Sequence, residues 1–99
     1  MEGIVKDDEI RSGQPRIDGT RITVLDVKRR IIDGGEDPHV VAGEYDVSLA
    51  DLFAALTVYY RNREQFAEDE RSFAADRAVG ERRAEELVST AADLSERAD

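Results

Sequence analysis

The stretch GQPRIDGTRITV, residues 13–24, decides how the first part of this chain is expected to fold. Asp18-Gly19 is a preferred dipeptide for a two-residue hairpin turn, because both central residues of that turn take positive φ. The turn predicts a short β-hairpin near the N-terminus, with Pro15 favouring an edge position because proline cannot donate to a ladder. The predicted register pairs Ile17 with Thr20, Arg16 with Arg21, and Pro15 with Ile22.

This register places Arg16 and Arg21 side by side on one face of the hairpin. Like charges directly opposite each other destabilise a strand pair, so the arrangement predicts a compensating negative charge beside them. Two interpretations stay open: an anion from outside the chain, nucleic acid included, or the nearby acidic run of residues 7–9. Arg16 and Arg21 are therefore candidate anion or nucleic-acid contacts.

The sequence TVLDVKRRIIDGG, residues 23–35, predicts a helix that follows the hairpin. Thr23 is a suitable N-cap, Asp26 lies three residues on, and Gly34 is a typical stop. Three further candidate nucleic-acid contacts follow one another on this helix, namely Lys28, Arg29 and Arg30. Adjacent helical residues point in different directions, so a solvated helix face is the competing interpretation.

Two more helices are expected between residues 37 and 60. Asp37 and Pro38 begin the first, with apolar contacts from residues 40, 41 and 45, and Ser48 with Asp51 caps the second. The second helix has one apolar stripe, formed by Leu49, Leu52, Phe53, Leu56 and Tyr60. A turn of about three residues between the two helices is helix-turn-helix spacing.

Beyond residue 60 the sequence is rich in charged helix formers and predicts a long C-terminal helix. A thin heptad seam recurs along it: Phe66, Phe73, Gly80, Leu87 and Leu94. We expect Phe66, Phe73, Leu87 and Leu94 to contact a partner or a second copy, because so sparse a seam buries little alone. The predicted organisation is a hairpin and helix-turn-helix-like core over residues 1–66 and a charged helical extension over 67–99, in a mainly α fold.

Composition limits the classes of function. The 99 residues include 14 basic and 23 acidic side chains, a formal net charge of −9, and no cysteine. This acidic, lysine-poor composition resembles proteins of salt-loving microbes and argues against general adhesion to nucleic acid. No apolar run suits a membrane span and no signal peptide is evident, so we expect a cytoplasmic protein. His39 is isolated, and no carboxylate lies in a catalytic motif, so neither a metal, a cofactor, a small-molecule substrate nor an enzymatic activity is expected.

A resemblance adds to this interpretation. The motifs GTRI (residues 19–22) and ALTVYY (residues 55–60), with Gly13, Pro15, Ile17 and the Gly34-Gly35 pair, resemble the domain-of-unknown-function family 433 over roughly residues 4–70. The resemblance implies kinship with antitoxins of the VapB class, dimerisation, and pairing with a PIN-type ribonuclease toxin. It implies no catalytic residues.

The expected function is therefore an antitoxin-like dimeric protein that neutralises a PIN-type ribonuclease toxin, with a linked role in transcription. Arg16 and Arg21 then have toxin carboxylates as a further candidate partner. One alternative is a DNA-binding regulator that uses the basic hairpin and first helix. The helix expected over residues 49–60 presents few base-reading side chains, which argues against sequence-specific recognition by that helix. Another alternative is a non-catalytic oligomerisation module.

Overall fold

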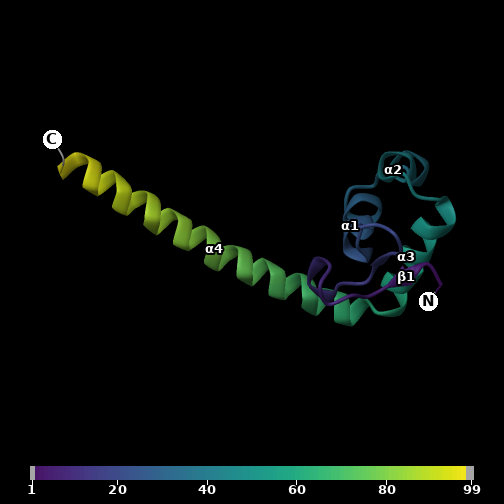
Figure 1. Cartoon of the computed structure of the whole chain (residues 1–99). Coiled ribbons are helices and arrows are strands. Elements are labelled where there is room, and N and C mark those ends of the chain that lie inside the picture. Colours follow the sequence, from purple (N-terminus) through teal and green to yellow (C-terminus); the bar gives the residue numbers. More distant parts are fainter. Residues whose placement is uncertain (1, 98–99) are drawn as a thin grey trace. The chain divides into compact units, whose positions relative to one another are not determined.

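The computed structural model describes the backbone of residues 2–97 and the side chains of residues 2–90. Figure 1 shows the mainly helical chain with a short antiparallel strand pair near its N-terminus and a long C-terminal helix, as predicted for the fold class. The elements are β1 (Ile4–Val5), the 3-10 turn η1 (Arg11–Gly13), β2 (Arg16–Ile17), α1 (Val24–Lys28), the π-helix η2 (Arg29–Asp33), α2 (Pro38–Tyr45), α3 (Leu49–Arg61) and α4 (Arg63–Arg97). The chain divides into two compact units, Met1–Phe66 and Ala67–Asp99, each described below by itself.

The strand pairing differs from the predicted hairpin. The partner of β2 is β1, with Ile4 opposite Ile17 and Val5 opposite Arg16. After the Asp18-Gly19 turn the chain returns to β2 only through an isolated bridge between Arg16 and Thr23. The predicted pairing of Arg16 with Arg21 is therefore wrong by two residues.

Thr20 explains this shift. Its hydroxyl donates to the Ile17 carbonyl oxygen at 2.8 Å and accepts from the Ile22 amide at 3.0 Å. The Ile17 amide in turn donates to the Ile22 carbonyl oxygen at 2.9 Å, which widens the loop to residues 18–21. Only Gly19 of the two central turn residues takes positive φ, +79°, so the expected two-residue turn type is also wrong. Side-chain hydrogen bonds have replaced the tight strand pairing.

The core of the first unit lies between α1 and α3, which pack together with β2 beside them. Val24 and Val27 of α1, Leu52 and Ala55 of α3, and Ile17 of β2 are each at most 1% exposed. The predicted cap of α1 is present as a reciprocal pair: the Asp26 amide donates to Thr23 Oγ1, and the Thr23 amide donates to Asp26 Oδ2, both at 3.0 Å. The cap fixes where α1 begins, and thereby which of its residues face α3.

The helix that was predicted to continue to Gly34 widens into the π-helix η2 after Lys28. The Gly34 amide donates to the Arg29 carbonyl oxygen, five residues back, at 2.9 Å. A Cβ at position 34 would lie 2.9 Å from the Arg30 carbonyl oxygen, too close for any other residue without a shift. Gly34 therefore ends the helix as predicted. The reason is steric, because the nearby carbonyl oxygen leaves no room for a side chain.

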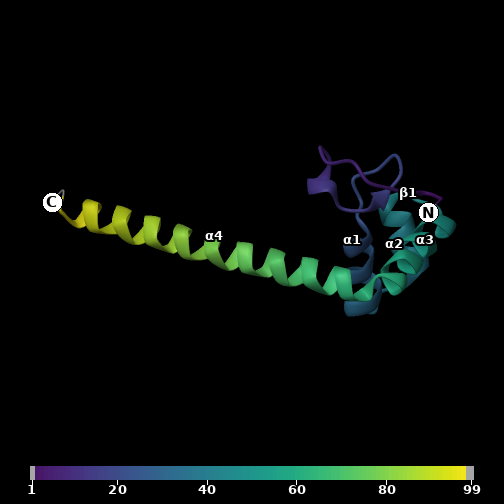
Figure 2. The same cartoon turned by 90° about the horizontal axis from the view of Figure 1, so that it is seen from below.

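Helices α2 and α3 lie side by side, joined by a turn at residues 46–48 in which Asp46 is left-handed (Figure 2). Both predicted caps are present: Asp37 accepts from the His39 amide at 2.8 Å and Ser48 from the Asp51 amide at 3.1 Å. The expected apolar contacts are only partly buried, because Val40, Phe53 and Tyr60 are 53%, 50% and 58% exposed. The core of the first unit therefore uses only part of the predicted apolar stripe.

The second unit is the part of α4 from Ala67 onward. Every residue from Ala74 to Thr90 is exposed, including Leu87 at 71% and Val88 at 69%. No helix among residues 2–97 combines the length and apolar character that a membrane crossing requires.

Candidate functional site

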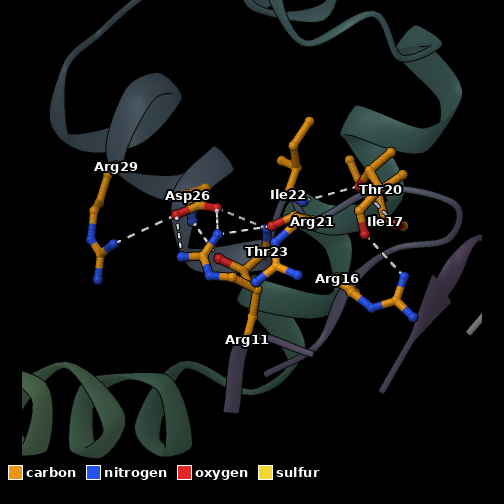
Figure 3. A network of polar contacts seen from close by, with 9 residues as sticks. All are labelled: Arg11, Arg16, Ile17, Thr20, Arg21, Ile22, Thr23, Asp26 and Arg29. Atoms are coloured by element: carbon orange, nitrogen blue, oxygen red, sulfur yellow. Dashed lines mark hydrogen bonds and ion pairs between the residues drawn. The ribbon is translucent and has the colours of Figure 1, made fainter. Parts of the chain in front are cut away.

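Arg16 is a buried side chain and not part of an exposed cationic pair. It is 9% exposed, and its Nη1 donates to the Thr20 carbonyl oxygen at 3.0 Å. Figure 3 shows this guanidinium directed toward Thr20, on the opposite side from Asp26. The wider loop is the physical reason, because its carbonyl groups turn toward the strand and offer Arg16 an acceptor.

Arg21 lies in the exposed part of the same loop. Its backbone carbonyl oxygen accepts from Arg11 Nη1 at 2.8 Å, and no hydrogen bond or ion pair of its side chain is found within residues 2–90. The predicted juxtaposition of the Arg16 and Arg21 guanidinium groups is therefore absent. The acidic residues 7–9, the internal alternative for this pair, contact neither side chain in the part of the chain described.

Asp26 is the centre of the polar network in this region. Arg11 Nη1 donates to Asp26 Oδ2 at 2.9 Å, and Arg29 Nη1 lies 3.7 Å from Asp26 Oδ1 (Figure 3). Partial burial opposes ionisation of Asp26, but the hydrogen bonds from Arg11 and from the Thr23 amide outweigh it and hold the pKa of Asp26 below its ordinary value. Arg11, which carries this contact, was not singled out from the sequence, where nothing marks a residue 15 positions away as its partner.

Lys28 and Arg30 form two further ion-pair groups within the first unit. Lys28 Nζ donates to Asp33 Oδ2 at 2.8 Å and lies 5.8 Å from the Tyr59 ring centroid. Arg30 donates to both Glu36 oxygens, at 2.8 and 2.6 Å, and also to Glu44 Oε2, and its guanidinium lies 5.1 Å from the Tyr45 ring centroid. Glu36 and Glu44 raise the pKa of Arg30 further above its high ordinary value, and Arg30 lowers the pKa of Glu36. These contacts of Arg30 join η2 to α2.

The five candidate cations thus lie in separate surroundings. Arg16 is buried, while three others have carboxylate partners in this chain, namely Lys28, Arg29 and Arg30. Arg21 alone of the five is exposed without a side-chain partner in the region described. An incoming phosphate would have to displace these internal contacts.

The four candidate partner contacts also separate. Phe66 is 3% exposed, with its ring centroid 6.0 Å from that of Tyr59, so it belongs to the core of the first unit and is not available to a partner. Phe73 is half-exposed and Leu87 is exposed, while the side chain of Leu94 lies outside the described residues. Leu87 is joined by the neighbouring Val88, which the heptad pattern did not indicate.

A second exposed apolar surface lies on α3, where Phe53 and Tyr60 are seven residues apart. The signal was available: α3 carries more apolar residues than one packed face of a helix can bury. Neither surface is accompanied by metal-binding geometry, since within residues 2–90 no group of three or more His, Cys, Asp or Glu residues is placed to hold a metal ion. The first unit therefore offers an exposed aromatic surface on α3.

Comparisons with known proteins place the first unit in a family. Searches among curated proteins and among solved structures found no match. The pattern of the family described as "Protein of unknown function (DUF433)" matches residues 4–60, more than half of the chain and nearly all of the first unit. The chain therefore belongs to the DUF433 family.

Proposed function

We propose that this chain is a non-catalytic, dimeric binding protein of the antitoxin type, in which the second unit binds a protein partner. The observation that supports this proposal is the exposure of α4, where Leu87 and Val88 are 71% and 69% exposed. A helix gains most of its stability by packing an apolar face, and this one has no core of its own among the residues described. A partner that covers Leu87 and Val88 supplies the missing burial.

The partner class is a PIN-type ribonuclease toxin, which the resemblance of the chain to VapB-class antitoxins suggests. Four arginines occur along the exposed segment, namely Arg71, Arg77, Arg82 and Arg83. Guanidinium groups form strong, often bidentate contacts with carboxylates, and such a nuclease holds its metal with carboxylates. An arginine of α4 placed among them would neutralise the charge that holds the metal.

The first test is to inspect the neighbouring reading frame, which we expect to encode a small nuclease with an acidic metal site. The two chains are then co-expressed and purified through a tag on the nuclease, and RNA cleavage is measured. We expect co-purification and loss of cleavage. Absence of any such nuclease partner, or an uninhibited complex, contradicts the proposal.

The binding surface is tested with a Leu87→Ala, Val88→Ala variant, which preserves helix propensity. We expect affinity for the nuclease to fall at least about tenfold. Val40→Ala is the matched control, because Val40 is 53% exposed but lies in the first unit, and it is expected to bind like the wild type. Equal affinity of the double variant and the wild type would place the contact elsewhere.

A DNA-binding regulator is the second candidate, and one observation favours it: α2 and α3 are joined by a three-residue connection, as in helix-turn-helix proteins. Among the five candidate cations, Arg21 is exposed and has no side-chain partner within residues 2–90, so its guanidinium is available to a phosphate. Titration of labelled duplex DNA at low and raised salt tests this role. Binding that weakens steeply with salt and is lost in Arg21→Ala would favour this candidate, whereas we expect no such binding.

A further inference from the structure

One face of α3 is an uncharged stripe over three turns of helix, in which Ala50, Phe53 and Tyr60 are exposed. This α3 stripe consists of Leu49, Ala50, Phe53, Leu56, Thr57 and Tyr60. Phe53 and Tyr60 are 50% and 58% exposed. Leu56, which lies between them along the stripe, is only 9% exposed. The charged residues of α3, Asp51 and Arg61, lie outside the stripe. In a chain with net charge −9, an uncharged face of this length is a place where two copies can approach without repulsion.

The aromatic side chains of the stripe continue into the core. The Tyr60 ring lies edge-on to Tyr59, with centroids 5.2 Å apart, and Tyr59 lies 6.0 Å from the buried Phe66. Lys28 Nζ lies 5.8 Å from the centroid of Tyr59, the middle ring of this cluster. An aromatic group held in this way loses little conformational freedom on binding, which is why such residues dominate interface energetics.

The stripe of one copy is complementary to the stripe of a second copy that runs in the opposite direction. A twofold axis between Leu56 and Thr57 sets each Phe53 against the partner's Tyr60, with the half-buried Thr57 and the 9% exposed Leu56 at the centre. Large residues then meet at the ends and smaller ones at the centre. An interface that repeats the same patch on both copies is the usual geometry of a dimer.

The charges at the two ends of α3 select the same orientation. Arg61 and Arg63 are exposed at its C-terminal end, and Asp46 is exposed just before its N-terminal end. None of these three has an ion pair among the residues described. Antiparallel packing brings the basic end of each copy toward the acidic end of the other, whereas parallel packing sets the two basic ends together.

We propose that the α3 stripe is the surface through which two copies of this chain associate, antiparallel about an axis between Leu56 and Thr57. A nucleic acid or an anionic membrane does not suit this face, because the stripe holds no basic residue. The contact is one helix wide, so we expect an interface near the low end of stable ones, roughly 1,200 Å² in total, and a dimer that dissociates on dilution. This proposal rests on the dimeric part of the proposed function, for which it names the surface, and it does not depend on nuclease binding by α4.

Sedimentation equilibrium of the full chain over a range of concentrations tests the surface. We expect a monomer–dimer equilibrium, with a dissociation constant that rises roughly tenfold or more in Phe53→Ala, because each dimer loses the side chain twice. Val40→Ala is the matched control at 53% exposure and should leave the constant unchanged. A wild type that stays monomeric at about millimolar concentration, or a dimer unaffected by Phe53→Ala, overturns the proposal. A dimer weakened only by Leu87→Ala would transfer self-association to α4.

Crosslinking tests the orientation, and the chain is suited to it because it has no cysteine. Single variants Ala50→Cys, Thr57→Cys and Arg61→Cys are oxidised under mild conditions. Measured along the helix axis of an antiparallel pair, the two copies of position 57 are offset by about 1.5 Å, against about 20 Å for position 50 and about 13.5 Å for position 61. We expect a disulfide-linked dimer only from Thr57→Cys, since a disulfide needs Cα atoms within about 7 Å. Crosslinking at both stripe positions, 50 and 57, indicates parallel packing and overturns the orientation.

Discussion

At the scale of single residues, Arg16 and Arg21 have different environments although the same motif contains both. Arg16 is 9% exposed and donates to the Thr20 carbonyl oxygen, whereas Arg21 is exposed in the loop. Both side chains carry the same charge. Their surroundings give Arg16 a structural role and leave Arg21 at the surface.

We expect Arg16→Ala to lower the free energy of unfolding by about 1–2 kcal/mol, because it removes a buried aliphatic stem and leaves the Thr20 carbonyl oxygen without this donor. Arg21→Ala is the matched control and should change it by less than about 0.5 kcal/mol. Urea denaturation of both variants measures the difference. Equal effects would show that the burial of Arg16 carries no stability.

Asp26 makes a pH-dependent contribution to stability. Its pKa is lower in the folded chain than the ordinary 3.8, so its contacts stabilise the fold while it is charged, and this contribution is lost as the pH falls through the folded pKa. We expect Asp26→Asn to cost about 1–2 kcal/mol near pH 7, since it weakens both the cap of α1 and the Arg11 contact. In urea titrations the gap to the wild type should narrow below about pH 4.

Asp76→Asn, an exposed change in α4, is the control for this measurement and should show no such gap. A cost for Asp26→Asn that is the same at pH 3 and pH 7 would mean that charge at Asp26 does not stabilise the fold.

At the scale of elements, the junction of η2 and α2 shows what a glycine position requires. Gly34 has backbone carbonyl oxygens 2.9 and 3.3 Å from the place of a Cβ, whereas Gly43 in α2 has open space there. The sequence predicts Gly34 as a helix stop but does not show that a side chain would be excluded there and accommodated at position 43.

We expect Gly34→Ala to destabilise the first unit by about 1–3 kcal/mol, because the backbone of η2 must move. Gly43→Ala should instead stabilise it by up to about 1 kcal/mol, since alanine favours the helix and meets nothing. Thermal unfolding of the two variants gives opposite shifts in Tm. Shifts of the same sign would contradict the steric account.

The apolar face of α3 explains why sequence periodicity overestimated the core. Leu52 and Leu56 are buried against the first unit, but Phe53 and Tyr60 lie too far around the helix to reach it. Sequence periodicity identifies the residues of an apolar face, but it does not show how many of them contact the core. The remainder is the α3 stripe proposed as the dimer surface.

At the scale of the whole molecule, the boundary at Phe66 separates a packed body from a helix whose residues are exposed from Ala74 to Thr90. Phe66 is 3% exposed and closes the core of the first unit. A chain ending after Phe66 should therefore keep all the buried residues of that unit.

We expect the fragment of residues 1–66 to unfold cooperatively, with a Tm within a few degrees of that of the full chain, because none of residues 67–90 is buried. A fragment ending after residue 61 is the control and should be clearly less stable, since it lacks Phe66. Circular dichroism melting curves measure both. Loss of cooperative unfolding in the 1–66 fragment would show that the first unit depends on the rest of α4.

Several features could be predicted from neighbouring residues: the caps at Thr23, Asp37 and Ser48, the stop at Gly34, and the long C-terminal helix. These features arise from short-range hydrogen bonds and periodicity, which a local stretch of sequence contains. Three other features depend on packing between distant segments: the pairing of β2 with β1, the contact of Arg11 with Asp26, and the burial of Arg16 beside an exposed Arg21. Each of these depends on which distant segment supplies a partner, and a charged or polar side chain takes whichever acceptor the packed backbone places within its reach.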